Sequence, residues 1–201
     1  MTEQGSLALL RHGETAWSRE GRHTGRTDIP LTPDGERRAS AARGLLAGHV
    51  ASVVLCSPLV RARQTARLAG LTPDAFDEDL LEWDYGAWEG RRTIDIREEL
   101  GDPAWVVWDH PVPQGVTDGE QPADVAVRAA RVIARAEPVL AAGGDVVLVA
   151  HGHLLRILTA TWLGLAPAAG RLFALDAGAV SLLGHEHDQR VVTAWNLTPP
   201  S

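Results

Sequence analysis

Two apolar segments far apart in the chain each end in the dipeptide His-Gly. Residues 6–10 lead through one arginine into His12-Gly13, and residues 145–150 lead directly into His151-Gly152. Apolar runs of this length are typical of strands buried on both faces, as in a parallel sheet. Ligands of such sheets bind beyond the carboxyl ends of the strands. If the two strands are parallel neighbours, both imidazoles lie in one crevice, and this requirement limits the fold more than any other feature.

Strand-like and helical patterns alternate along the rest of the chain. Thr32 and Pro33 are the N-cap and first-turn residues that begin a helix. The expected strands are residues 6–10, 52–56 and 145–150 with short runs between 171 and 197, and the expected helices are residues 33–46, 57–68, 93–100, 103–108, 122–142 and 152–163. This alternation predicts an α/β protein, a three-layer αβα sandwich around a mostly parallel sheet. A length of 201 residues fits a single domain over residues 1–201.

Charge and cysteine content argue against several kinds of partner. The formal net charge of −7 disfavours nucleic acid, because phosphate backbones recruit basic surfaces. A single cysteine, Cys56, allows neither an internal disulfide nor a cysteine-built zinc site. No apolar run approaches the roughly 18 residues of a membrane span, and no targeting segment is visible. We therefore expect a cytoplasmic protein that binds neither nucleic acid nor membrane.

Four blocks of sequence surround the two histidines and follow one another along the chain. They are residues 11–15 (Arg-His-Gly-Glu-Thr) with Thr24-Gly25, residues 57–66, residues 82–90 and residues 150–153. In this order they resemble the histidine phosphatase superfamily, which has the phosphoglycerate-mutase-like fold. Residues 14–18, 82–86 and 151–153 together are similar to small bacterial acid phosphatases of that superfamily, and a fungal sedoheptulose-1,7-bisphosphatase shares much of the pattern.

The resemblance implies that His12 attacks phosphorus and becomes a phosphohistidine, which water then hydrolyses. Arg11, Arg61 and His151 would bind the phosphoryl oxygens. An imidazole is a competent nucleophile when one nitrogen is unprotonated and the other is held by a hydrogen bond. Cations around His12 disfavour its protonation, and the planar fork of arginine suits phosphate oxygens.

A leaving alkoxide needs a proton, and the resemblance places the general acid at Glu82. Asp84 and Glu89 are alternatives, although Glu89 has the character of a structural loop carboxylate. The resemblance also implies that residues from about 82 to 122 form a loop-and-helix insert that covers the active site.

Further contacts with the substrate are expected from Ser18, Thr24, Gly25, Tyr85 and Gly152. Ser18 stands where many relatives carry an asparagine that contacts phosphate, and its hydroxyl has a shorter reach. His153 either binds substrate or caps the helix that starts there. Trp105, Trp108 and Trp162 suit either the core or the interface of a homodimer.

These residues predict a phosphomonoesterase that acts on a small phosphorylated metabolite, such as a sugar phosphate. No cofactor or metal is expected, because no carboxylate cluster suited to holding two cations is present. The first alternative is phosphoglycerate-mutase-type transfer. It is disfavoured because Asp109, which would repel a second phosphate, stands near where mutases have paired arginines. The chain does have adjacent arginines at Arg91-Arg92, but these are expected to face solvent. The second alternative is a non-catalytic phosphate-binding module, which the full set of catalytic residues disfavours.

Overall fold

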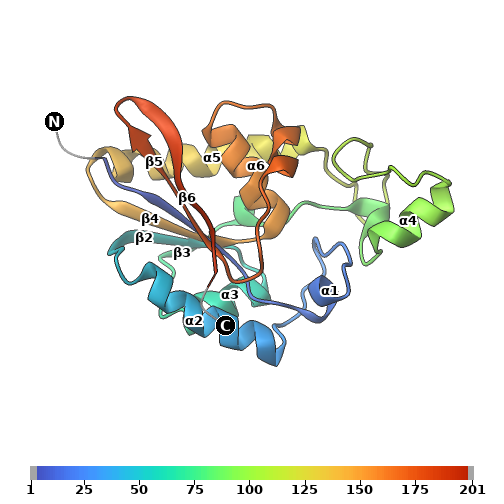
Figure 1. The fold of residues 1–201 in the computed structure, drawn as a ribbon, viewed down its shortest axis with the longest axis horizontal. Coiled ribbons are helices and arrows are strands. Elements are labelled where there is room, and N and C mark those ends of the chain that lie inside the picture. The colour runs from blue at the N-terminus through green and yellow to red at the C-terminus, as the bar shows by residue number, and fades with distance from the viewer. Residues whose placement is uncertain (1–3, 199–201) are drawn as a thin grey trace.

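A six-stranded sheet forms the centre of the protein, as seen in a computed structural model that describes residues 4–198 (Figure 1). The strands are β1 (Leu7–Arg11), β2 (Ala51–Cys56), β3 (Ala75–Phe76), β4 (Asp145–Ala150), β5 (Val180–Glu186) and β6 (Gln189–Leu197). Their order is β3-β2-β4-β1-β5-β6. The first four are parallel, whereas β5 is antiparallel to β1 and β6 is antiparallel to β5. The prediction of an α/β fold with a mostly parallel sheet is confirmed.

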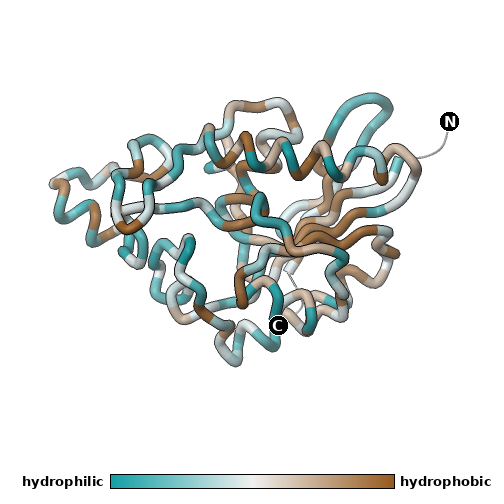
Figure 2. The backbone as a smooth tube through the Cα atoms, turned by 180° about the vertical axis from the view of Figure 1, so that it is seen from behind, coloured by the Kyte–Doolittle hydropathy of each residue, from teal (hydrophilic) through white to brown (hydrophobic). Residues whose placement is uncertain are grey.

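Helices cover both faces of the sheet. On one face α2 (Pro33–Leu46) and α3 (Val60–Leu68) pack against Ala8 and Leu10, and on the other α5 (Pro122–Ala141) and α6 (Gly152–Trp162) pack against Leu7 and Leu9. Successive residues of β1 therefore point into different cores, as the strand period of two requires. Figure 2 shows the hydrophobic strands gathered between these helical layers. No helix within residues 4–198 has the length and apolar character needed to cross a membrane.

The segment between β3 and α5 extends beyond the sheet as a mixture of short helices and loops (Figure 1). It contains two 3₁₀ turns, Glu78–Leu80 and Gly86–Trp88, and the helix α4 (Thr93–Leu100). Trp105 lies in this segment and is 1% exposed, as is Trp162 in α6, so both are core residues of this chain. The outermost residues of the predicted domain, 1–3 and 199–201, lie outside the described part of the chain.

Several predicted elements differ from the observed ones. Residues 103–108 form turns rather than a helix, and the side chain of Arg97 takes the Trp105 carbonyl as its acceptor. Helix α3 begins at Val60 rather than at residue 57, since Leu59 is still extended, and the Asp28 carboxylate accepts the free N–H of Val60. The four-residue α1 (Ala16–Arg19) and the two-residue β3 are too short to show a sequence period. Residues 167–172 form a 3₁₀ helix before β5.

The loop that leaves β1 lies directly against the start of α2. A Cβ atom on Gly13 would be 2.3 Å from the carbonyl oxygen of Gly35, and one on Gly35 would be 2.1 Å from that of Glu14. Thr32 caps α2 by accepting from the Gly35 N–H at 3.0 Å, and its hydroxyl donates to the Glu14 carboxylate at 2.7 Å. Glycine after His12 is thus required by the close approach of two backbones.

We predict that Gly13→Ala lowers the free energy of unfolding by about 1–3 kcal/mol, because the added methyl group meets rigid backbone. Gly44→Ala in α2 is the matched control, since a Cβ there would meet nothing within 4 Å. That variant should gain up to about 1 kcal/mol from helix propensity. Urea unfolding of both variants measures the difference, and a Gly13→Ala protein as stable as wild type would contradict the packing argument.

Candidate active site

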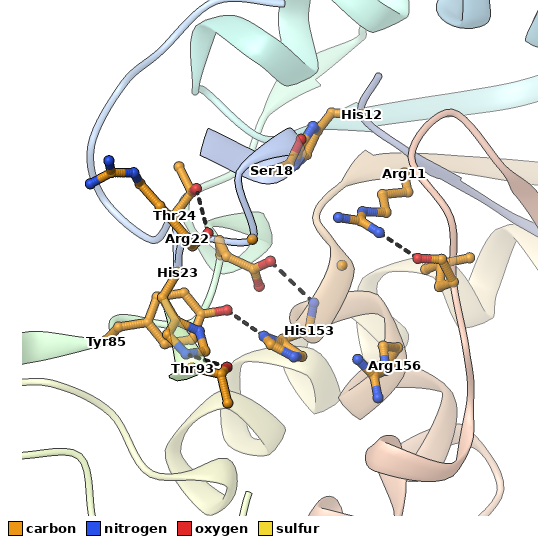
Figure 3. Close-up of a pocket in the computed structure, with 14 residues that line it drawn as sticks. Arg11, His12, Ser18, Arg22, His23, Thr24, Tyr85, Thr93, His153 and Arg156 are labelled. Atoms are coloured by element: carbon orange, nitrogen blue, oxygen red, sulfur yellow. Dashed lines mark hydrogen bonds between the residues drawn. The ribbon is translucent and has the colours of Figure 1, made fainter. Parts of the chain in front are cut away.

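A pocket of about 260 Å³ opens at the carboxyl ends of β1 and β4 (Figure 3). Its walls come from the end of β1, from α1 and the loop after it, from the segment after β3, from the start of α6 and from the loop before β5. The lining residues are Arg11, His12, Ser18, Gly21, Arg22, His23, Thr24, Glu82, Tyr85, Thr93, Gly152, His153, Arg156 and Leu175. The register of the sheet explains the location, because Arg11 pairs with Ala150 and the next residues, His12 and His151, leave at the same edge.

His12 and His151 lie together, with ring centroids 5.1 Å apart. The Nδ1 of His12 is 2.7 Å from the carbonyl oxygen of Gly13. A carbonyl oxygen only accepts, so Nδ1 carries the proton and Nε2 of the neutral ring keeps its lone pair. Burial, aided by Arg61 and Arg11, holds the pKa of His12 well below its usual value, and the hydrogen bond to Gly13 opposes this only in part. His12 is therefore a neutral imidazole with an available nitrogen.

Arg11 presents an unsatisfied cation to the same pocket. Its Nη1 donates to the carbonyl oxygen of Leu175, whereas its buried Nε has no hydrogen-bond partner within residues 4–198. The residue also lines the pocket, so its guanidinium places positive charge where an anion can bind. Gly152 makes room for this side chain, since a Cβ there would lie 3.1 Å from the Arg11 Cζ.

Arg61 and His151 are fully buried behind the pocket lining. Arg61 donates Nε–H to His151 Nδ1 at 3.1 Å and its other groups to the carbonyls of Thr24, Gly25 and Thr27. Because arginine is always a donor, His151 carries its own proton on Nε2, which lies 2.7 Å from Ser57 Oγ. In this structure Arg61 organises the loop 24–27 and retains a single free N–H, rather than presenting the open fork that the sequence suggested.

Glu82 lines the pocket and is 5% exposed. Its Oε1 accepts from the N–H groups of Trp83 at 2.9 Å and Leu154 at 2.8 Å, and its Oε2 accepts from the His153 N–H at 3.1 Å. The carboxyl group is thus held by main-chain N–H groups in the first turn of α6. The alternatives point elsewhere: Asp84 accepts from Gly86 N–H, and Glu89 from the N–H groups of Gly25 and Thr27.

Three predicted contact residues have structural partners of their own. The Ser18 hydroxyl lies in the pocket lining but also forms a capping box with Thr15. The Thr24 hydroxyl lines the pocket and donates to the Arg22 carbonyl at 3.1 Å. Gly25 lies outside the lining, and its N–H donates to Glu89 at 2.9 Å. A Cβ on Gly25 would be 2.5 Å from the Trp83 carbonyl oxygen, so this glycine is required by close packing.

The wall opposite Arg11 and His12 contains an aromatic cluster that sequence analysis largely missed. Tyr85 and His153 share a hydrogen bond between the hydroxyl group and Nδ1, and His23 lies 4.8 Å from the Tyr85 ring (Figure 3). The ring of Trp108 meets His153 edge-on at 4.8 Å, and the guanidinium of Arg156 stacks on Trp108 at 4.7 Å. His153 lines the pocket and donates its main-chain N–H to Glu82, whereas the N-cap position of α6 belongs to His151, so His153 does not cap that helix.

The residues that argued against a mutase lie away from the pocket lining. Asp109 is half exposed and pairs with Arg171 rather than facing the pocket, so the repulsion expected from it is not supported. Arg91 and Arg92 pair with Glu99 and Asp95 at the surface, as expected. Within residues 4–198 no three His, Cys, Asp or Glu side chains form a metal-binding group.

The family model of the histidine phosphatase superfamily (branch 1) matches residues 7–198. The chain belongs to this superfamily. Its sequence is 42% identical to an acid phosphatase of Mycobacterium tuberculosis, over 96% of this chain and 92% of the relative. It is 34% identical to a sedoheptulose 1,7-bisphosphatase of Saccharomyces cerevisiae (78% and 67%) and 33% identical to a 2,3-bisphosphoglycerate-dependent phosphoglycerate mutase of Bifidobacterium longum (76% and 74%).

The fold agrees with this assignment. A solved structure of an open reading frame product from Mycobacterium tuberculosis superimposes with a TM-score of 0.90 at 41% identity, and the match covers 98% of this chain and 99% of that one. The resemblance inferred from the four sequence blocks is confirmed, and the protein is a phosphatase of the histidine phosphatase superfamily.

We predict that His23 makes the stability of this phosphatase sensitive to acid. Burial lowers the pKa of His23 to about 4, whereas an unfolded histidine titrates near 6.5. Between these values only the unfolded chain binds the proton, so the free energy of unfolding falls as pH falls, by about 3 kcal/mol from pH 7 to pH 4.

Urea unfolding of His23→Gln and of wild type at several pH values tests this linkage. The variant should gain stability relative to wild type by about 3 kcal/mol across that range. His187→Asn, at the exposed β5–β6 turn, is the control and should show no such relative gain. Parallel pH curves for His23→Gln and wild type would contradict the prediction.

Proposed function

We propose that this phosphatase is a metal-independent phosphomonoesterase that hydrolyses a small phosphorylated metabolite through a phosphohistidine on His12. The observation that carries the proposal is the neutral His12, which keeps the lone pair of its Nε2 and lines one pocket together with the guanidinium of Arg11 and the carboxyl group of Glu82. A nucleophile, an anion-binding cation and a proton donor are the parts that phosphoryl transfer through a covalent intermediate needs.

In the first step His12 Nε2 attacks phosphorus, the N–P bond forms and the bond to the leaving oxygen breaks. Glu82 gives that oxygen its proton, so the product leaves as an alcohol. Oε2 is the suitable oxygen of Glu82, because it accepts one main-chain N–H whereas Oε1 accepts two. Arg11 binds the phosphoryl oxygens, and the remaining N–H of Arg61 adds positive charge from behind the lining.

In the second step water attacks the phosphohistidine. Glu82, now a carboxylate, takes a proton from that water, the N–P bond breaks and inorganic phosphate is released. His12 returns to its neutral form with the proton still on Nδ1, held by the Gly13 carbonyl. His151 supports this cycle by fixing Arg61, which in turn holds the loop 24–27 at the mouth of the pocket.

The size and chemistry of the pocket support a small, hydroxylated substrate. Its volume of about 260 Å³ is below the roughly 300–1,000 Å³ of pockets for drug-sized ligands. Beyond the phosphate-binding groups the walls offer neutral hydrogen-bonding side chains, among them Thr24, Thr93 and His153. Hydroxyl groups of a sugar phosphate suit such walls, and the relative named as a sedoheptulose bisphosphatase acts on a sugar phosphate.

We predict that the wild-type protein hydrolyses p-nitrophenyl phosphate in EDTA and that His12→Ala abolishes turnover. Brief reaction with ³²P-labelled substrate followed by base quenching should trap a phosphoprotein whose label is stable in alkali and lost in acid, as expected for phosphohistidine. His187→Asn is the control and should be labelled like wild type. Label that persists on His12→Ala, or activity that EDTA removes, would overturn the proposal.

Mutase-type transfer is the second candidate, favoured by Arg22 and Arg156 in the pocket lining, where a second anionic group could bind. We expect net hydrolysis, because both arginines already have protein acceptors: Arg22 pairs with Glu20, and Arg156 donates to the carbonyls of Gly170 and Arg171. Incubation with 3-phosphoglycerate and a trace of 2,3-bisphosphoglycerate should release inorganic phosphate without appreciable 2-phosphoglycerate. Formation of 2-phosphoglycerate as the main product would reverse this preference.

A further inference from the structure

Arg128 projects from α5 onto the stretch of main chain that carries Glu82. Its Nη1 donates to the carbonyl oxygens of Asp79 at 2.8 Å and Leu81 at 2.9 Å, and its Nη2 donates to that of Glu82 at 3.4 Å. Its Nε and Nη2 also donate to the two carboxylate oxygens of Glu120, at 2.6 and 2.8 Å. These bonds use all five N–H groups of the guanidinium. Arg128 therefore has no donor left for a substrate, and it lies outside the pocket lining.

Glu120 forms further hydrogen bonds to the residues after Glu82. Its carboxylate accepts from the Asp84 N–H at 2.9 Å, and its carbonyl oxygen accepts from the indole N–H of Trp83 at 2.7 Å. Arg128 and Glu120 together hold the main chain on both sides of Glu82. The pair is largely buried, with side chains 10% and 16% exposed, so water competes little for these bonds.

The stretch from Leu81 to Tyr85 has no regular secondary structure. Helix or sheet hydrogen bonds therefore do not set its position, and the side-chain bonds from α5 take their place. On the opposite side the Glu82 carboxylate contacts the N–H groups of His153 and Leu154 at the start of α6. The general acid is thus placed between two helices, with its main chain held by α5 and its carboxylate held by α6.

We propose that Arg128 is a positioning residue for the proton donor: by holding the carbonyls of Asp79, Leu81 and Glu82, it sets where the Glu82 carboxyl group meets the leaving oxygen. This inference rests on the proposed role of Glu82 as general acid. A misplacement of about 1 Å is enough to cost a reacting group on the order of 10²-fold in rate. Loss of Arg128 should therefore weaken the protonation of the leaving group, whereas the attack by His12 depends on the separate contacts at the end of β1.

The leaving group distinguishes these two effects. p-Nitrophenolate departs without a proton, whereas the alkoxide of glycerol phosphate needs one, so loss of the acid lowers the ratio of the alkyl to the aryl kcat/KM. Glu82→Gln should lower this ratio about 10²- to 10⁴-fold. Arg128→Gln should lower it about 10- to 100-fold. The ratio does not depend on the fraction of protein that is folded, because both substrates are measured on one preparation.

Two further variants complete the test. Arg131→Gln is the matched control: it lies one turn further along α5 and binds the Asp79 carboxylate, but makes no bond to the carbonyls of 79–82, so the wild-type ratio should persist. Arg128→Lys keeps a charge beside Glu120 but lacks the fork, and it should lower the ratio even if Arg128→Gln fails to fold.

Each outcome has a distinct meaning. If Glu82→Gln keeps the wild-type ratio, Glu82 is not the acid and that part of the proposed function fails, together with this inference. If Glu82→Gln lowers the ratio but Arg128→Gln and Arg128→Lys do not, only the positioning role of Arg128 is overturned. An equal fall for Arg131→Gln would also overturn it, because general loosening of the loop would then explain the effect.

Discussion

The parallel pairing of β1 with β4 is the interaction on which the rest of the site depends. The ladder continues past the strand itself, where the His12 N–H donates to the Ala150 carbonyl at 2.9 Å. This bond sets the height at which each chain leaves the sheet, so that the two imidazoles meet 5.1 Å apart. A shift of one residue in this register would move every side chain of the strand to the other face. Both faces of β1 are buried, so such a shift would exchange the residues that pack into the two cores, and this packing fixes which side chains stand at the strand end.

Burial then has opposite consequences for the two kinds of group at that edge. For His12 and His151 it removes the proton, because desolvation and the neighbouring arginines both lower the pKa of each ring. Arg11 keeps its charge, and burial leaves its Nε–H without an acceptor. The pocket therefore combines a neutral imidazole, His12, with the cation of Arg11.

The parts of this site that sequence could predict are those determined by local order along the chain. Strand ends, the cap at Thr32 and the four family blocks are all read from neighbouring residues, and they located His12, Arg11, Glu82 and Gly152 in one pocket. Contacts between distant residues were not accessible in this way. The acceptors that occupy Arg61 lie more than thirty positions away, and the amide of Gly25 is taken by Glu89 rather than left for a ligand. His23 and Arg156 belong to no motif and reach the pocket only through packing.

The two halves of the pocket are built by different means, and this has a consequence for how substrates are chosen. His12 and Arg11 stand at the end of a sheet strand, whose position many ladder bonds determine. Thr24, Tyr85 and Thr93 come from loops or a helix start, held by a few side-chain bonds such as those from Arg61 and between Tyr85 and His153. Loops tolerate substitution better than strands. Substitutions in these walls can therefore reshape the pocket while the strand ends stay as they are. Glu82 is intermediate between the strand ends and the loops: its segment is irregular, but α5 and α6 both hold it in place.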